Sequence, residues 1–104
     1  MIVCAANINR SVTAAWLLNL ADNDNRYFGR GSNQAACRIH GGTYCTQEDY
    51  DDSESIICMD DRNKREIEAA YGTSKSITVL GIEDKYKAFS SELMEEILLK
   101  IELS

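Results

Sequence analysis

The sequence predicts one α/β domain, residues 1–104, with a four-stranded parallel sheet covered by helices on both faces. Three observations lead to this expectation. Short apolar runs alternate with segments of helical periodicity, which is the pattern of βα units. A chain of 104 residues is long enough for one compact core and too short for two. The hydrophobic content of 44% and the charged content of 27% are ordinary for a globular protein.

The opening residues predict a strand, a helix and a loop, in that order. Met1–Cys4 is a short apolar run that fits a buried strand. Ser11–Ala21 has helical spacing, and we expect Trp16 within it to belong to the core rather than to a ligand site. The apolar face of this helix comprises Ala14, Leu17, Leu18 and Ala21. The polar, glycine-containing stretch Asp22–Gln34 predicts a loop that is either slack or shapes specificity.

Three further strands are expected along the rest of the chain. Cys37–Thr43 predicts a short strand that ends in a glycine turn, with His40 near the end of the strand. Ile56–Met59 is a continuous apolar run, typical of a strand that is covered on both faces. Ser76–Leu80 predicts the fourth strand.

Two more helices complete the prediction. The segment after Met59 looks helical, with Asp60 and Asp61 expected as caps and Gly72 as the stop signal. The last helix is expected to begin after Ser90, a plausible N-cap. Its apolar residues recur at spacings of three and four and comprise Leu93, Met94, Ile97, Leu98 and Ile101.

The net charge and the cysteine content limit the classes of partner and ligand that we expect. The net charge of −6 argues against a nucleic-acid partner, because binding to phosphate backbones needs a basic face. We expect no membrane partner and a cytoplasmic location, since no apolar run could span a bilayer and no secretory signal is evident. The cysteines at positions 4, 37, 45 and 58 form no C-x-x-C pair, so we expect free thiols, no metal and no cofactor.

The stretch CAANINRS, Cys4–Ser11, combines groups that suit phosphate chemistry. In a parallel sheet it lies at the carboxyl ends of the strands, together with His40–Thr43, Asp60 and the loop after Leu80. The backbone N–H groups of such a tight loop can form a nest for an anion, and the positive end of the following helix reinforces it. The Arg10 guanidinium adds donors that fit phosphate oxygens. The same field favours the thiolate of Cys4, a nucleophile that can attack phosphorus.

The segment VCAANINRSVTAA resembles the phosphate-binding loop of the low-molecular-weight protein tyrosine phosphatases, V-C-x-G-N-I-C-R-S-P-T-A-E. The matching positions are Val3, Cys4, Asn7, Ile8, Arg10, Ser11, Thr13 and Ala14. The segments IHGGT, SIICMDDRN and VLGIEDKYKAFSSEL are similar to later parts of that family. The resemblance implies a phosphotyrosine phosphatase I-like fold, which is a flavodoxin-like three-layer sandwich.

The resemblance also implies roles for individual residues. Cys4 would form a phosphocysteine intermediate, and Arg10 would clamp the phosphoryl oxygens. Asp84 would protonate the leaving oxygen and then act as the base on the hydrolytic water. Asn7 would fix the loop, and Ser11 would donate a hydrogen bond to the thiolate.

The remaining substrate contacts follow from the same resemblance. The loop would cradle the phosphate through the backbone of Ala5, Ala6, Ile8 and Asn9. Tyr86 would wall the pocket and stack on an aromatic substrate, with Tyr44 as a candidate for the opposite wall. The substrate would be a phosphorylated protein or a small phosphate ester, and inorganic phosphate would be a product.

Four positions depart from the family pattern. Asn9 stands in place of a second cysteine, so the disulfide that this cysteine forms with the nucleophile in the family is absent. Ala6 replaces a glycine, and Val12 replaces a proline at the helix start. Glu83 replaces the proline before the expected acid and adds a negative charge that repels acidic phosphopeptides.

Three alternative functions remain open from the sequence. An arsenate reductase of the same fold would need two relay cysteines, for which Cys37 and Cys45 are available, although they precede the segment where such enzymes carry theirs. A phosphocarrier domain would share the early cysteine, but it would have no arginine six residues later. A phospho-binding protein without hydrolysis is the third alternative.

Overall fold

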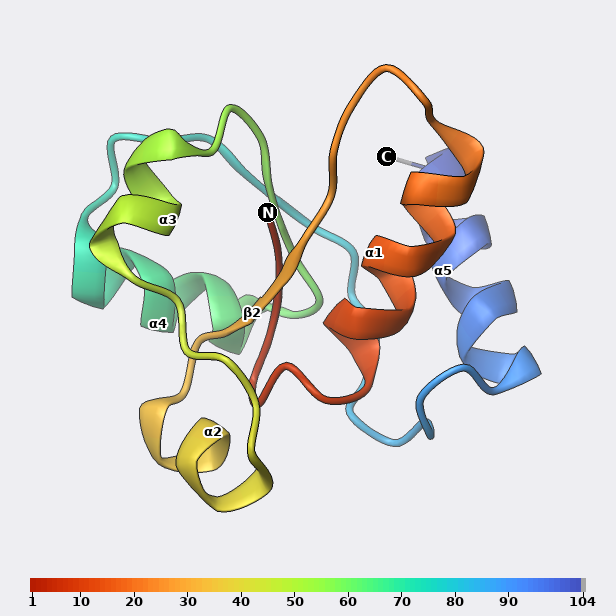
Figure 1. The fold of residues 1–104 in the computed structure, drawn as a ribbon, viewed down its shortest axis with the longest axis horizontal. Coiled ribbons are helices and arrows are strands. Elements are labelled where there is room, and N and C mark those ends of the chain that lie inside the picture. Colours follow the sequence, from red (N-terminus) through yellow and green to blue (C-terminus); the bar gives the residue numbers. More distant parts are fainter. Residues whose placement is uncertain (104) are drawn as a thin grey trace.

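The computed structural model describes residues 1–103 and is an α/β structure with a parallel sheet (Figure 1). In chain order the elements are β1 (Ile2–Cys4), α1 (Arg10–Ala21), β2 (Gly29–Gly31), α2 (Gln34–His40), α3 (Gln47–Asp52), β3 (Ile56–Cys58), α4 (Asp61–Tyr71), β4 (Ile77–Val79) and α5 (Ser91–Leu103). No helix of the described residues has the length and apolar character needed to cross a membrane.

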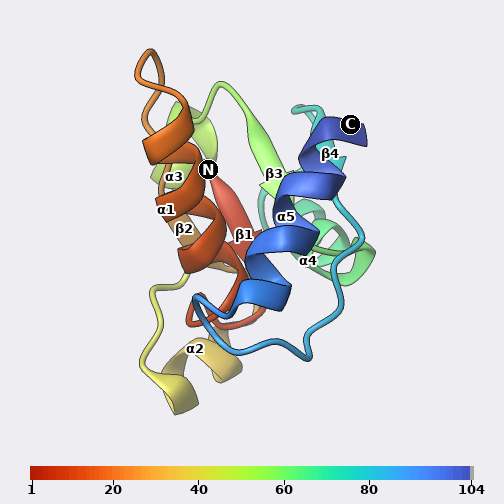
Figure 2. The same cartoon turned by 90° about the vertical axis from the view of Figure 1, so that its right-hand side faces the viewer.

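The four strands form one sheet in the order β2-β1-β3-β4, and every neighbouring pair is parallel. The predicted four-stranded parallel sheet is therefore confirmed. Helices α1 and α5 cover one face, and α3 and α4 cover the other (Figure 2). Helix α2 lies beyond the carboxyl ends of the strands, at the bottom of Figure 1, next to the loop that joins β1 to α1.

The side chains of β1 divide between two cores, because successive residues of a strand point to opposite faces. Ile2 and Cys4 face the core beneath α1 and α5, where they join Ala14, Leu93 and Ile97. The core on the other face lies beneath α3 and α4 and contains Met1, Val3, Cys45, Tyr50, Ile56, Cys58 and Ile67. A strand of three residues can thus serve both layers, which explains its unbroken apolar sequence.

The predicted strand at Cys37–Thr43 is wrong, because residues 34–40 form helix α2. The Asn33 side chain caps the helix by accepting from the N–H of Ala36, and Gly41 ends it in the left-handed conformation at φ 77°. His40 is consequently an exposed residue at the end of a helix and not at the end of a strand.

The second strand, β2, lies instead within the stretch predicted to be a loop. Its three residues pair in register with Ile2, Val3 and Cys4 of β1. Because two of its three residues are glycines, β2 lacks the apolar side chains by which a strand is predicted from sequence. A Cβ at Gly29 would lie 2.5 Å from Asn7 Oδ1, and one at Gly31 would collide with Cys37 Sγ. The glycines are therefore required by the close approach of the neighbouring segments.

The other predicted elements agree with the structure within one or two residues. Asp60 caps α4, and Gly72 follows its last residue. The N–H of Leu93 donates to Ser90 Oγ at 3.3 Å, as expected for the start of α5. Helix α3 has six residues and begins with a capping box at Thr46, and no helix is predicted there from the sequence.

Trp16 is a further correction, because its side chain is 48% exposed rather than part of the core. It faces solvent beside Phe89, with the two rings edge to face at 5.6 Å. All four cysteines are free thiols, as predicted.

Candidate active site

The loop 5–9 joins the carboxyl end of β1 to the start of α1. Asn7 adopts a left-handed conformation at φ 57°, which asparagine tolerates better than most residues. The turn after β2 holds the loop from one side, since the N–H of Ser32 donates to the Cys4 carbonyl and the N–H of Asn33 to that of Ala5. Gly42 packs against it so closely that a Cβ would collide with the Ala6 carbonyl. Two separate segments of the chain thus fix the shape of the loop.

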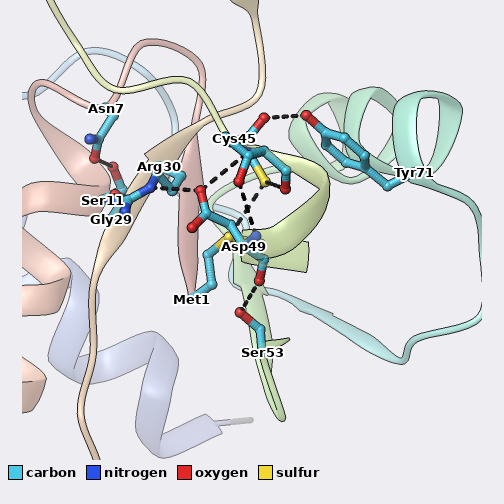
Figure 3. A network of polar contacts seen from close by, with 10 residues as sticks. Met1, Asn7, Ser11, Gly29, Arg30, Cys45, Asp49, Ser53 and Tyr71 are labelled. Atoms are coloured by element: carbon cyan, nitrogen blue, oxygen red, sulfur yellow. Dashed lines mark hydrogen bonds and ion pairs between the residues drawn. The ribbon is translucent and has the colours of Figure 1, made fainter. Parts of the chain in front are cut away.

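Cys4 is held at the floor of this loop by a chain of polar contacts. Its side chain is buried, and Sγ lies 3.0 Å from Ser11 Oγ. Ser11 Oγ in turn donates to Asn7 Oδ1 at 2.7 Å, a contact that Figure 3 shows. When Cys4 is a thiol, its proton can go to Ser11. When it is a thiolate, Ser11 can turn its own proton to sulfur, and Asn7 can offer its amide nitrogen to the hydroxyl.

Arg10 is the most deeply buried charge at the site, with an exposed fraction of 1%. Its Nη1 donates to Asp60 Oδ2 at 2.7 Å and to the Ile82 carbonyl at 2.8 Å. Its Nε is buried and has no hydrogen-bond partner among the described residues. A buried charged donor without an acceptor costs free energy, on the order of 1–3 kcal/mol or more. The guanidinium is therefore anchored at one end and has donor capacity to spare at the other.

A cavity of about 270 Å³ opens beside Cys4 and Arg10. A cavity of this size has room for several water molecules, each of which takes about 30 Å³ in the liquid, and therefore for a phosphate group. The residues that line it are Cys4, Ala5, Ala6, Ile8, Asn9, Arg10, Ala36, His40 and Asp84. Eight of these nine come from the predicted carboxyl-edge segments, including the turn near His40 and the loop that follows Leu80.

The start of helix α1 adds a positive field to this cavity. The first N–H groups of a helix have no acceptor within the helix, so they are open to an external anion. No acidic residue lies in the first turn of α1, and the side chain of Asn9 makes no cap there. The helix dipole is therefore not neutralised by the chain itself. A bound tetrahedral oxyanion would fill this role.

Asp84 is placed at the mouth of the cavity, as expected for an acid that meets a leaving group. Its Oδ1 lies 3.6 Å from Arg10 Nε, and its side chain is 63% exposed. The loop that carries it is tied to the start of α1, because the N–H of Phe89 donates to Thr13 Oγ1 at 2.9 Å. The neighbouring Glu83 pairs with Lys85 at 3.6 Å, which offsets part of the extra negative charge that the sequence placed here.

The two predicted aromatic walls lie elsewhere. Tyr86 packs against the core cluster beneath α1 and α5. The backbone of Tyr44 forms an isolated parallel β-bridge with Gly31. Neither residue lines the cavity, whereas Ile8 and His40 do. The stacking roles of Tyr86 and Tyr44 stay predictions.

Sequence reasoning missed two partners of the site. Asp60 was expected at this edge of the sheet and as the cap of α4, but not as a partner of Arg10; one of its oxygens caps the helix and the other pairs with Arg10. His40 was expected at this edge as the end of a strand, whereas it lines the cavity from the end of α2. A signal for Asp60 existed, since the acidic residue follows a buried strand at the carboxyl edge. The position of His40 depends on α2, which the sequence did not reveal.

The other cysteines differ from Cys4 in their surroundings. Burial raises the pKa of Cys45 to about 11 and the pKa of Cys58 to about 12, so both stay protonated at neutral pH. Both face the core beneath α3 and α4, and the Cys45 carbonyl accepts from Tyr71 in the network of Figure 3. Burial also raises the pKa of Cys37, with the charge of Cys4 as the second cause. Cys4 is the one thiol that lines the cavity.

Within residues 1–103, no group of three His, Cys, Asp or Glu side chains is placed to hold a metal ion. The chain matches no model of a protein family, and a search of curated proteins finds no significant similarity either.

Proposed function

We propose that this protein hydrolyses phosphotyrosine or a related aryl phosphate monoester through a phosphocysteine intermediate. The observation that supports this most is that Cys4 and Arg10 line one cavity at the start of α1, where Arg10 Nε is buried without an acceptor. A phosphoryl group provides oxygens for that donor and an electrophile for the thiolate. The resemblance to the low-molecular-weight protein tyrosine phosphatases agrees, and the strand order β2-β1-β3-β4 is compatible with the flavodoxin-like fold of that family.

Binding places phosphorus over the sulfur of Cys4. The backbone N–H groups of the loop and of the first turn of α1 donate to the phosphoryl oxygens. Arg10 Nε donates to a further oxygen, while Asp60 and the Ile82 carbonyl keep the guanidinium in position. These donors also stabilise the charge on the oxygens in the transition state, where they act at full strength because they are already in place.

The first step transfers the phosphoryl group to the enzyme. The Cys4 thiolate attacks phosphorus, the S–P bond forms, and the P–O bond to the leaving group breaks. Asp84, at the mouth of the cavity, donates its proton to the leaving oxygen. In the second step Asp84 takes a proton from water, which attacks phosphorus and releases inorganic phosphate. Ser11 Oγ stabilises the departing thiolate by donating to sulfur.

The structure favours this function over arsenate reduction, which would need a relay of two further cysteines. Cys37 lies beside the loop, with its Sγ 3.7 Å from the Ala5 carbonyl. Cys45 belongs to the core on the opposite face of the sheet, so it cannot form a disulfide with Cys4 or Cys37 unless the protein unfolds. A phosphocarrier domain would have no arginine at this place, so the buried guanidinium of Arg10 favours hydrolysis over that role.

Turnover of p-nitrophenyl phosphate tests the proposal. We expect the wild type to release p-nitrophenol and Cys4→Ser to lose activity by about 10⁴-fold or more. Cys45→Ser is the matched control, because it makes the same exchange at a buried cysteine that does not line the cavity, and it should keep activity within about twofold. Acid quenching during turnover of a ³²P-labelled aryl phosphate should trap label on Cys4.

Three outcomes would overturn the proposal. A wild type that hydrolyses neither p-nitrophenyl phosphate nor phosphotyrosine would not be this kind of hydrolase. Label that stays on Cys4 without release of phosphate would identify a phosphocarrier instead. Consumption of reduced thiol with arsenate, in the absence of ester hydrolysis, would restore the reductase alternative.

A further inference from the structure

Cys37 is a buried nucleophile that the proposed hydrolysis does not use. It lies on α2 with an exposed fraction of 3%, and its Sγ donates to the carbonyl of Ala5 at 3.7 Å. Ala5 is the residue that directly follows Cys4 in the phosphate-binding loop. The thiol of Cys37 therefore touches the backbone next to the proposed nucleophile, although the two cysteines are far apart in sequence.

The register of the sheet places the two sulfurs on the same side. Cys4 on β1 pairs with Gly31 on β2, and the strands are parallel. Paired residues of parallel strands point their side chains to the same face, and the strands lie about 4.8 Å apart. A Cβ at Gly31 would overlap Cys37 Sγ. The sulfur of Cys37 thus occupies the place that a side chain of residue 31 would take, directly beside the side chain of Cys4.

We propose that Cys37 is the resolving cysteine of Cys4, so that a hydroperoxide converts the pair into a reversible Cys4–Cys37 disulfide. This rests on the proposed function, in which Cys4 is a thiolate. Because Cys37 Sγ occupies the place of a Cβ at Gly31, which pairs with Cys4, it lies about one strand spacing, roughly 4.8 Å, from the Cys4 side chain. The disulfide would block phosphate binding and protect the nucleophile from irreversible oxidation.

The reaction takes two steps. The Cys4 thiolate attacks one oxygen of the hydroperoxide, the O–O bond breaks, and the S–O bond of a sulfenic acid forms while hydroxide or alkoxide leaves. The sulfur of Cys37 then attacks the sulfur of Cys4, the S–O bond breaks, and the S–S bond forms. The leaving hydroxide takes the proton of Cys37 and departs as water. The two cysteines are oxidised by two electrons in total, and the peroxide is reduced.

The environments of the two thiols suit these roles, in which Cys4 reacts with the peroxide and Cys37 resolves the sulfenic acid. Cys4 lines the cavity and is within reach of a small oxidant. Cys37 does not line it, and burial together with the charge of Cys4 raises its pKa, so it stays a thiol beside the thiolate. The two remaining cysteines belong to the core on the other face of the sheet and cannot compete.

Peptide mapping after mild oxidation tests the inference. The folded wild type is treated with one to a few equivalents of hydrogen peroxide, alkylated, and digested without reduction. We expect the intact protein to lose the mass of two hydrogen atoms and a Cys4–Cys37 peptide pair to appear. Dithiothreitol should then restore both the thiols and nearly all of the activity. The variant Cys37→Ser should hydrolyse p-nitrophenyl phosphate within about twofold of the wild type before oxidation.

The same variant gives the sharpest contrast after oxidation. Cys37→Ser should gain two or three oxygen atoms on Cys4, and dithiothreitol should restore less than about a tenth of its activity. Cys45→Ser, the control, should behave as the wild type. The inference is overturned if wild-type Cys4 gains oxygens without a disulfide, or pairs with Cys45 or Cys58. Because the mass readout does not depend on turnover, it separates this inference from the hydrolase proposal. Should Cys37→Ser fail to fold, the wild-type map alone decides.

Discussion

The sheet has a cavity at each end, and the two are nearly equal in size. The cavity at the carboxyl ends of the strands measures about 270 Å³, and the one at the amino ends about 250 Å³. The second is lined by Met1, Asn25, Arg26, Tyr27, Phe28, Asp52, Ser53, Glu54, Ser55 and Ile57. Volume alone therefore does not distinguish a reactive site from a surface hollow.

The chemistry at the two ends differs. At the amino end, the α-amino group of Met1 donates to the Ser55 carbonyl at 2.8 Å, and Asp52 and Glu54 are exposed. At the carboxyl end, the Nε of a buried guanidinium makes no hydrogen bond within the described residues, and the N-terminus of α1 faces the same space. An anion site is thus recognised by hydrogen-bond donors that have no acceptor within the fold, and not by the volume of a cavity.

The largest expected effect comes from replacing the guanidinium of Arg10. Arg10→Lys keeps the positive charge but loses the planar fork and the buried Nε, so we expect kcat/KM for p-nitrophenyl phosphate to fall by about 10³-fold. Arg30→Lys is the matched control, because Arg30 is also ion-paired, to Asp49 at 2.9 Å, but does not line the cavity. Equal losses in both variants would show that the effect at Arg10 does not depend on its place at the cavity.

The next effect concerns the proton donor. Asp84→Asn should lower kcat by about 10²-fold for phenyl phosphate, whose leaving group needs a proton, and by less than about tenfold for p-nitrophenyl phosphate. Asp52→Asn makes the same change at the amino-end cavity and should leave both rates unaltered. A loss at Asp84 that is independent of the leaving group would rule out its role as the acid.

A smaller effect is expected where Arg10 is anchored. Asp60→Asn keeps an N-cap for α4 but removes the charge that faces the guanidinium at 2.7 Å. Because the Asp60 side chain is 32% exposed, we expect the free energy of unfolding to fall by only about 1–2 kcal/mol. Activity should fall by about tenfold, since Arg10 loses its fixed position. Chemical denaturation and steady-state kinetics measure the two losses, and an unchanged stability would show that the ion pair contributes nothing.

The smallest effect concerns the buried thiols that line neither cavity. In the folded protein burial raises the pKa of Cys58 to about 12, whereas an unfolded cysteine has a pKa of about 8.5. Above pH 8.5 the unfolded chain therefore binds fewer protons than the folded one, and the free energy of unfolding falls as pH rises. We expect Cys58 alone to contribute a slope of about 1 kcal/mol per pH unit between pH 9 and 10, so that the slope is shallower by about this amount in Cys58→Ala. Identical slopes in the two proteins would contradict the burial of this thiol.

The sequence allowed the carboxyl-end site to be predicted because its main groups are local. Cys4 and Arg10 are six residues apart, and a strand before the loop and a helix after it fix their relation. The anchors of Arg10 could not be predicted in the same way, since Asp60 and the Ile82 carbonyl reach it only through the order of strands in the sheet.

The errors in the fold have a common cause in close packing. β2 consists of Gly29, Arg30 and Gly31, and its glycines are required by neighbours, Asn7 and Cys37, that no local pattern reveals. Helix α2 is only seven residues long, and its caps at Asn33 and Gly41 outweigh the strand-like sequence that follows Cys37. Because the sequence predicts a strand in place of α2, it does not predict that Cys37 lies beside Cys4.

Titration of ¹⁵N-labelled protein with inorganic phosphate, followed by amide chemical shifts, tests the central claim most directly. We predict that the amides of residues 5–12 shift in a saturable way and that those of residues 25–28 and 52–55 do not. Arg10→Lys should weaken this response. Shifts confined to the amino-end cavity, or no saturable shift in residues 5–12, would contradict the assignment of Cys4 and Arg10 to an oxyanion site.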